Sequence, residues 1–216
     1  MTSSEPQRAY RRFPGVRAPK PLLSPDAERR LTARQLELLD ELQQLVAKEE
    51  LAGLTIAQIA AEVGCSLRTL YGIAPSKEEL VLTVVDRRLH RIGRRAIEAL
   101  DESLSPLAAL RAYLQVVNEA VLPEAASFSQ HFGLVPGAKR LLDGHENYVM
   151  AVTQRLLEQA IADGEIRAID AAPVAHVLGG LGREFARAEV AELSAAPPKE
   201  TADAIAEIFL RGLEKG

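Results

Sequence analysis

The stretch that decides the fold is GLTIAQIAAEVGCSLRTLY, residues 53–71. Thr55 can cap a helix through its side-chain oxygen, and Gln58 can reach back to the Thr55 N–H, which completes a capping box. Gly64 stands where a helix end favours a left-handed residue without a Cβ. The helix between them carries one apolar stripe at helical spacing: Ile56, Ile59, Ala60 and Val63. The stretch therefore begins with a short amphipathic helix that ends in a tight turn.

A second short helix is expected directly after this turn. Ser66 offers its cap, and Leu67–Ile73 is long enough for two helical turns. Ser76 and Glu79 then form another capping box immediately after Pro75, which predicts the start of a long helix. The whole has the spacing of a helix-turn-helix, a unit found both in DNA-binding domains and in all-α proteins where it is only structural.

At this point the sequence resembles the TetR family of bacterial transcriptional regulators, over roughly residues 34–90. The family carries a Leu-Thr-x-x-x-Ile-Ala segment, a Gly-x-Ser turn, a Thr-Leu-Tyr recognition helix and a Ser-Lys-Glu-Glu-Leu helix start. The corresponding segments of this chain, in the same order, are Leu54–Ala60, Gly64–Ser66, Thr69–Tyr71 and Ser76–Leu80. The chain departs from the family after Tyr71, where Gly72 removes a possible phosphate contact. Ala74 stands where the family has an aromatic residue, which is expected to weaken packing between the third and fourth helices.

The outward residues of the helix-turn-helix are the candidate DNA contacts. They are Thr55, Ser66, Leu67, Arg68, Thr69, Tyr71 and Lys77. All except Leu67 match positions that touch DNA in the resembled family, and burial of Leu70 and Ile73 would leave Leu67, Arg68 and Tyr71 outward. Arg68 suits either the O6 and N7 atoms of guanine or a phosphate, and the hydroxyl groups suit phosphate oxygens. The alternative for each residue is a solvated side chain or a helix cap.

The charge distribution agrees with contact to phosphate at the N-terminal end. The net charge is −4, with +4 in residues 1–30 and −8 in residues 96–216. Residues 1–30 contain five prolines and are expected either to be disordered or to form a basic arm that follows the DNA backbone or enters a minor groove. The arm's working residues would be Arg8, Arg11, Arg12 and Arg17.

Helical periodicity continues to the end of the chain, and no strand alternation is found, which predicts an all-α protein. Residues 31–78 are expected to form the DNA-binding domain, with its motif at about 55–74 and a first helix over 31–51. Residues 79–216 are expected to form a helical ligand-binding and dimerisation domain. The first helix beyond the motif would run from Lys77 to about Leu100, and further helices are expected over Ser105–Pro123, Glu124–Phe132, Ala138–Asp163, Asp170–Phe185 and beyond Pro198.

Five arginines crowd the middle of the predicted long helix: Arg87, Arg88, Arg91, Arg94 and Arg95. They form either a solvated face or ion pairs with the acidic C-terminal region.

Several functions have no support in the sequence. No nucleophile, phosphate-loop, dinucleotide or zinc-protease motif is present, so no enzyme, cofactor or metal site is predicted. The histidines are scattered along the chain at His90, His131, His145 and His176. No apolar run reaches the length of a membrane span, and a single cysteine fits a reducing cytoplasm. That residue, Cys65, is interpreted as a packing residue, with a redox role as the alternative.

The resemblance implies a small-molecule pocket and a homodimer in the C-terminal domain. The large side chains in the pocket-lining helices are Tyr113, Phe128, His131, Phe132, Tyr148 and Phe185, with core packing as the alternative for each. Gly179, Gly180 and Gly182 lie inside a predicted helix and indicate close approach of another backbone. The family forms its dimer through the last two helices. The sequence thus predicts a regulator, most simply a ligand-responsive repressor that binds a palindromic operator as a dimer. The alternative is a ligand-binding or partner-binding helical protein of the same fold that has lost DNA binding.

Overall fold

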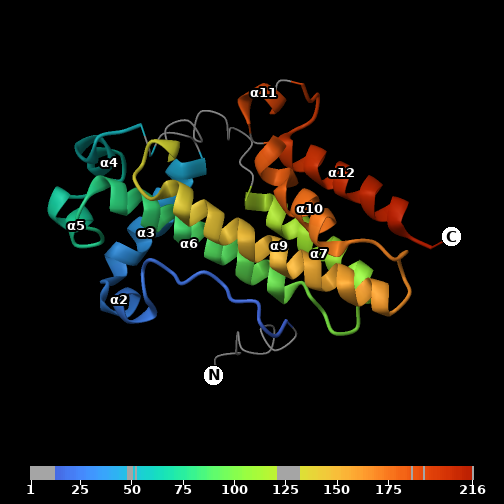
Figure 1. The fold of residues 1–216 in the computed structure, drawn as a ribbon. Helices are drawn as coiled ribbons and strands as arrows, with labels where there is room; N and C mark the ends of the chain where they lie inside the picture. The colour runs from blue at the N-terminus through green and yellow to red at the C-terminus, as the bar shows by residue number, and fades with distance from the viewer. Residues whose placement is uncertain are drawn as a thin grey trace. The chain divides into compact units, whose positions relative to one another are not determined.

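The computed structural model describes residues 13–47, 51, 53–120, 132–185, 187–191 and 193–215. Regular structure in these ranges is helical (Figure 1), apart from an isolated antiparallel bridge between Ile166 and Glu214. The all-α prediction is therefore confirmed. Among the same residues, no helix combines the length and the apolar character needed to cross a bilayer.

The described helices succeed one another along the chain. They are α2 (Pro25–Arg30), α3 (Ala33–Ala47), α4 (Ile56–Glu62), α5 (Leu67–Tyr71), α6 (Lys77–Glu98), α7 (Pro106–Val117), the 3₁₀ turn η1 (Asn118–Ala120), α9 (Ala138–Ala162), α10 (Ala171–Phe185), α11 (Ala188–Ala191) and α12 (Pro198–Leu213). Most of the expected helices are found within a few residues of their predicted bounds. The helix expected over Glu124–Phe132 lies almost wholly outside the described residues, as do residues 48–50 of the predicted first helix.

The chain divides into two compact units. Unit 1 comprises Met1–Pro19, Arg91–Pro123 and Gly144–Gly216, and unit 2 comprises Lys20–His90 and Glu124–Asp143. The boundary between them falls inside α6 and inside α9, whereas the sequence predicted a division after residue 78. The physical reason is that the first part of α6 belongs to the helix-turn-helix unit. Its apolar residues Leu80, Val81, Val84 and Val85 are buried.

An ion-pair cluster in unit 2 ties α6 to the two helices that precede the motif. Arg87 Nη1 lies 2.6 Å from Asp40 Oδ1 of α3, and its Nε lies 3.2 Å from Glu28 Oε1 of α2. The interpretation of Arg87 as part of a solvated face is therefore wrong. Arg95, in unit 1, pairs with Glu119 at 2.6 Å, as expected for an arginine that pairs with the acidic C-terminal region.

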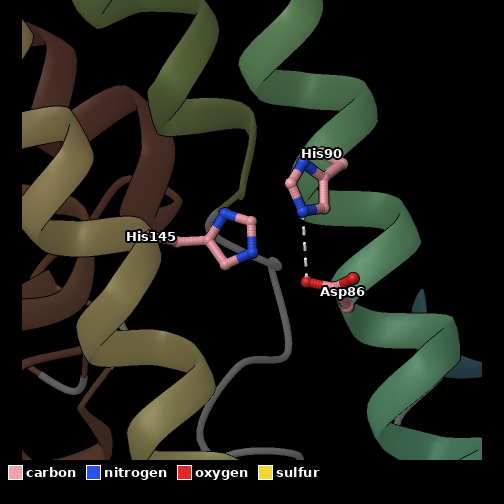
Figure 2. Close-up of side chains that lie close together, drawn as sticks. All are labelled: Asp86, His90 and His145. Carbon is pink, nitrogen blue, oxygen red and sulfur yellow. Dashed lines mark ion pairs between the residues drawn. The ribbon is translucent and has the colours of Figure 1, made fainter. Parts of the chain in front are cut away.

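The segment before α3 is ordered where the structure describes it, in contrast to the disorder expected over residues 1–30. Ser24 caps α2 with Pro25 at its first position, a start that the proline-rich composition obscured. The Leu22 N–H donates to Asp86 Oδ2 at 2.8 Å, and Asp86 Oδ1 lies 3.4 Å from His90 Nε2 one turn along α6 (Figure 2). His145, also drawn there, belongs to unit 1. Of the proposed arm, Arg17 is exposed, and Arg8, Arg11 and Arg12 lie outside the described residues.

Unit 1 is built around a hydrophobic core to which α7, α9, α10 and α12 contribute. Tyr113, Leu156 and Leu178 are among its buried members, and Phe13 from the N-terminal segment joins them. Polar contacts add specificity at the edge: Arg111 Nε lies 2.9 Å from Glu207 Oε2 and its Nη2 contacts Glu214. α10 and α12 pack against each other (Figure 1).

The glycines of α10 have more than one role. A Cβ on Gly179 would lie 3.0 Å from Met150 Cγ and 3.4 Å from Met150 Cα, so this glycine allows α10 to approach α9 within the same chain. The interpretation of Gly179 as a mark of contact with another subunit is therefore not needed. A Cβ on Gly180 would meet no atom within 4 Å, so that side of α10 is open.

Candidate nucleic-acid interface

Both ends of α4 are fixed by local contacts that the sequence predicted. The Thr55 N–H donates to Gln58 Oε1 at 2.8 Å and the Gln58 N–H donates to Thr55 Oγ1 at 3.3 Å, which completes the capping box. Gly64 has φ +60°, in the left-handed region, and the next N–H, of Cys65, donates to the Ala60 carbonyl at 2.9 Å. These bonds satisfy the end of α4 and direct the chain into α5.

The second helix of the motif is shorter than predicted. α5 ends at Tyr71 with Gly72 as its C-cap, two residues before the expected Ile73. The N–H groups of Ile73 and Ala74 both donate to the Leu70 carbonyl, which closes the helix in a tight last turn. Leu70 is fully buried and Ala74 is 5% exposed, so a small residue fills the position where the sequence suggested a packing defect.

The predicted contact residues lie mostly at the surface of unit 2. Thr55, Ser66, Leu67, Arg68 and Tyr71 are exposed, and Thr69 and Lys77 are half-buried. Five of the seven, residues 66–69 and 71, are brought together on α5 and its cap. Arg68 forms no ion pair with any described residue, so its guanidinium is available for a partner.

Three hydroxyl groups of the candidate set, those of Thr55, Ser66 and Thr69, have polar partners close by in the chain. Thr55 Oγ1 lies 2.7 Å from Gln58 Oε1. Ser66 Oγ accepts from the Thr69 N–H at 3.2 Å and lies 2.8 Å from Thr69 Oγ1. Thr55 and Ser66 therefore act as helix caps in the structure. A contact of either residue with phosphate would use a hydroxyl group that already takes part in a cap.

Two neighbouring side chains of α3, which sequence analysis missed, reach the ends of both helices of the motif. Arg34 Nη2 donates to the Val63 carbonyl at the end of α4 at 3.3 Å, and Gln35 Nε2 lies 3.5 Å from the Thr69 carbonyl of α5. Arg34 is itself held by Glu41 at 2.8 Å. The box formed by Thr32 and Gln35 at the start of α3 was a detectable signal, with the Thr32 N–H donating to Gln35 Oε1 at 2.9 Å. The contact between Gln35 and Thr69 joins residues 34 positions apart, and no short-range sequence pattern indicates it.

The Gln35 side chain also explains Gly72. A Cβ at residue 72 would lie 2.5 Å from Gln35 Nε2, so Gly72 makes room for that amide. We expect Gly72→Ala to displace the amide, a cost offset by about 0.4–1 kcal/mol from the lower conformational entropy of the unfolded chain, so that the free energy of unfolding changes little. In a Gln35→Ala background the same substitution should be more favourable, stabilising by up to about 1 kcal/mol, because the clash with the amide is absent and only the closer approach to the Thr69 carbonyl oxygen, at 3.3 Å from the new Cβ, opposes the gain. Urea unfolding of the four proteins tests this, and equal effects of Gly72→Ala in both backgrounds would contradict it.

Cys65 lies in the turn next to this surface. Burial raises the pKa of its thiol above the ordinary value, which disfavours the reactive thiolate at neutral pH. The packing interpretation of Cys65 is thereby favoured over a redox role.

The predicted ligand-pocket residues are divided between the two units. Tyr113, Tyr148 and Phe185 join the core cluster of unit 1, with Tyr113 fully buried. Phe132 is 1% exposed and belongs to unit 2, whereas Phe128 and His131 lie outside the described residues. Within unit 1, Thr153 Oγ1 of α9 is buried and has no hydrogen-bond partner among the described residues.

Comparisons with known proteins agree on the fold. No protein-family model matches this sequence, and no curated protein matches it. A TetR/AcrR-family transcriptional regulator from Thermobifida fusca is 19% identical, with 85% of this chain and 100% of that chain covered and a TM-score of 0.66. The TetR-family regulator PfmR from Thermus thermophilus is 21% identical over 82% and 99% of the two chains, with a TM-score of 0.59.

A third structure, a chain from Saccharomonospora viridis solved in complex with choline, is 18% identical over 85% and 98% of the two chains, with a TM-score of 0.65. The motif and the helices that follow it therefore define the class: helix-turn-helix proteins with a second, larger helical region. The particular fold is that of the TetR family of transcriptional regulators.

Proposed function

We propose that this chain is a member of the TetR family and acts in the cytoplasm as a DNA-binding transcriptional regulator. In this proposal a homodimer represses transcription at a palindromic operator and releases the DNA when a small molecule binds. The observation that carries the proposal is α5, a capped helix anchored by buried Leu70 whose exposed residues include Leu67, Arg68 and Tyr71. A helix presented in this way suits the major groove, which is wide enough to admit it.

The proposed dimer uses α10 and α12. On α12, Ala202, Ala206 and Leu210 are buried, whereas Ile208, on the opposite side of the helix, is 65% exposed. On α10 the exposed Val177 and the open side of Gly180 lie on one face. Exposed apolar residues on two helices that pack together support a self-complementary interface of the kind that a two-fold dimer needs. Two copies would place two α5 helices about 34–36 Å apart, one DNA turn, as palindrome recognition requires.

The proposed effector site lies in the core of unit 1. Tyr113, Tyr148 and Phe185 supply aromatic surface there. The buried Thr153 hydroxyl, without a partner among the described residues, is a polar group that a bound molecule or an ordered water would satisfy. Phe128, His131 and Phe132 remain further candidates from sequence. An effector changes the affinity for the operator only if it binds two conformations of the protein with different affinities. That difference sets the limit of the change. The choline bound to the Saccharomonospora viridis chain is an example of a small molecule held by this fold.

The proposal is tested by an anisotropy titration of the full chain with the DNA that flanks its own gene. The titration uses two salt concentrations and a scrambled competitor, followed by selection from random sequences. We expect tight binding that weakens with salt and survives the competitor. Failure to prefer any sequence after the selection would overturn the proposal in favour of a ligand-binding protein of the same fold.

Arg68→Ala should weaken operator binding by about 1–3 kcal/mol if its guanidinium contacts guanine. In that case the loss is confined to operators with the correct base, and the salt dependence stays unchanged. If Arg68 contacts a phosphate instead, the loss is uniform across sequences and the salt slope falls by about one. Titrations of the operator and of single-base variants separate these outcomes, and unchanged affinity would remove Arg68 from the interface.

A further inference from the structure

Two large apolar side chains lie exposed on the same face of α5. Leu67 and Tyr71 are four residues apart in the helix, and they are 42% and 49% exposed. Single exposed apolar residues are common on protein surfaces and need no explanation. Here, however, two of them belong to a helix of five residues and lie beside exposed Arg68. This pair is an unusual concentration of apolar surface on the element that the proposed function places in the groove.

The polar groups next to this face are already engaged. Ser66 Oγ accepts from the Thr69 N–H, and the two hydroxyl oxygens lie 2.8 Å apart. A base edge that meets α5 therefore finds one charged donor, from Arg68, together with the apolar Leu67 side chain and the Tyr71 ring with its hydroxyl group. Two of these three groups offer apolar contact.

The chemistry of the major groove selects the base that suits such a face. Of the four bases, thymine alone presents an apolar group there, its C5 methyl. Contact between this methyl and Leu67 removes apolar surface of both from water. A polar base edge placed against Leu67 would instead lose its hydrogen bonds to water without replacement.

We propose that Leu67, with the Tyr71 ring one turn along the same face of α5, is a specificity-determining residue whose side chain contacts a thymine methyl in each operator half-site. Arg68 supplies the polar contact beside it. This inference rests on the proposed function, because it requires α5 to enter the major groove. It deepens that function by specifying what the operator must contain.

The test replaces single thymines of the selected operator by deoxyuridine, which removes only the methyl group. For the wild-type chain, at least one replacement in each half-site should weaken binding about fourfold, the value of one buried methyl. Leu67→Ala should bind the thymine operator several-fold more weakly and should be indifferent to that same replacement. Arg68→Ala is the matched control on the neighbouring residue and should keep the fourfold effect. Leu67→Met should restore it, and Tyr71→Phe should keep it because the ring remains.

Each result decides the inference. Sensitivity to one thymine methyl that disappears in Leu67→Ala and persists in Arg68→Ala supports it. Specific, salt-sensitive binding that no deoxyuridine replacement weakens, or a methyl effect that survives Leu67→Ala, overturns it and leaves the proposed function intact. Absence of any sequence preference overturns both. Because Leu67 is exposed, the variant is expected to keep its fold, and an unchanged thermal unfolding midpoint verifies this.

Discussion

Leu70→Ala should lower the free energy of unfolding of this protein by about 2–4 kcal/mol, and DNA binding should be lost with it. Leu70 is the buried residue of α5, and 0% of its surface is accessible to solvent. Its truncation removes apolar contact and leaves a cavity that a five-residue helix cannot close by itself. Because isolated helices of this length are unstable, α5 should then open locally before the rest of the chain unfolds.

Urea unfolding and hydrogen exchange measure the two parts of this prediction. The amide protons of α5 should exchange faster in Leu70→Ala through local opening, whereas those of α10 and α12 should change only as far as the global free energy of unfolding falls. Leu67→Ala is the control on the same helix, because its side chain is exposed and its removal should change the unfolding free energy by about 0.5 kcal/mol or less. If the two variants were equally stable, burial of Leu70 could not be what anchors α5.

Ile208→Asp should convert the proposed dimer to a monomer and weaken operator binding by about 10²–10⁴-fold. The side chain is 65% exposed in the single chain and lies on the outer face of α12. A carboxylate buried in an apolar interface carries a large desolvation cost, whereas the same carboxylate on a free surface is tolerated. Loss of the dimer would remove the second half-site contact, which accounts for the large change in affinity.

Sedimentation velocity measures the assembly state, and anisotropy with full and half operators measures the affinity. Leu134→Asp is the matched control, since Leu134 is also a large exposed residue, at 82%, but lies in unit 2 outside α10 and α12. It should leave the dimer intact. A dimer that survives Ile208→Asp would show that this face of α12 is not the interface.

The parts of the motif that sequence analysis predicted correctly depend on neighbours within a few residues. The box formed by Thr55 and Gln58 spans three residues, and the left-handed Gly64 follows from the absence of a Cβ. The buried Leu70 follows from helical spacing. Each of these signals acts before the chain folds, which is why local reasoning was sufficient for them.

The errors occurred where distant residues decide the local structure. α2 was missed because its capping signal, Ser24 followed by Pro25, lies in a proline-rich segment whose order depends on contacts with Asp86 and Arg87 of α6. The early end of α5 places Gly72 beside the Gln35 amide of α3. Gly179 was interpreted as a mark of subunit contact, although Met150 of the same chain explains it.

The sequence by itself determined the helical class, the helix-turn-helix and the candidate residues on α5, because helix periodicity, caps and turn chemistry are short-range. Tertiary structure alone decided that α6 is shared between two units, that Arg87 binds α2 and α3, and that Arg34 and Gln35 reach the motif. These features depend on which side chains meet across tens of residues, and a linear pattern carries no information about such contacts until packing brings the elements together.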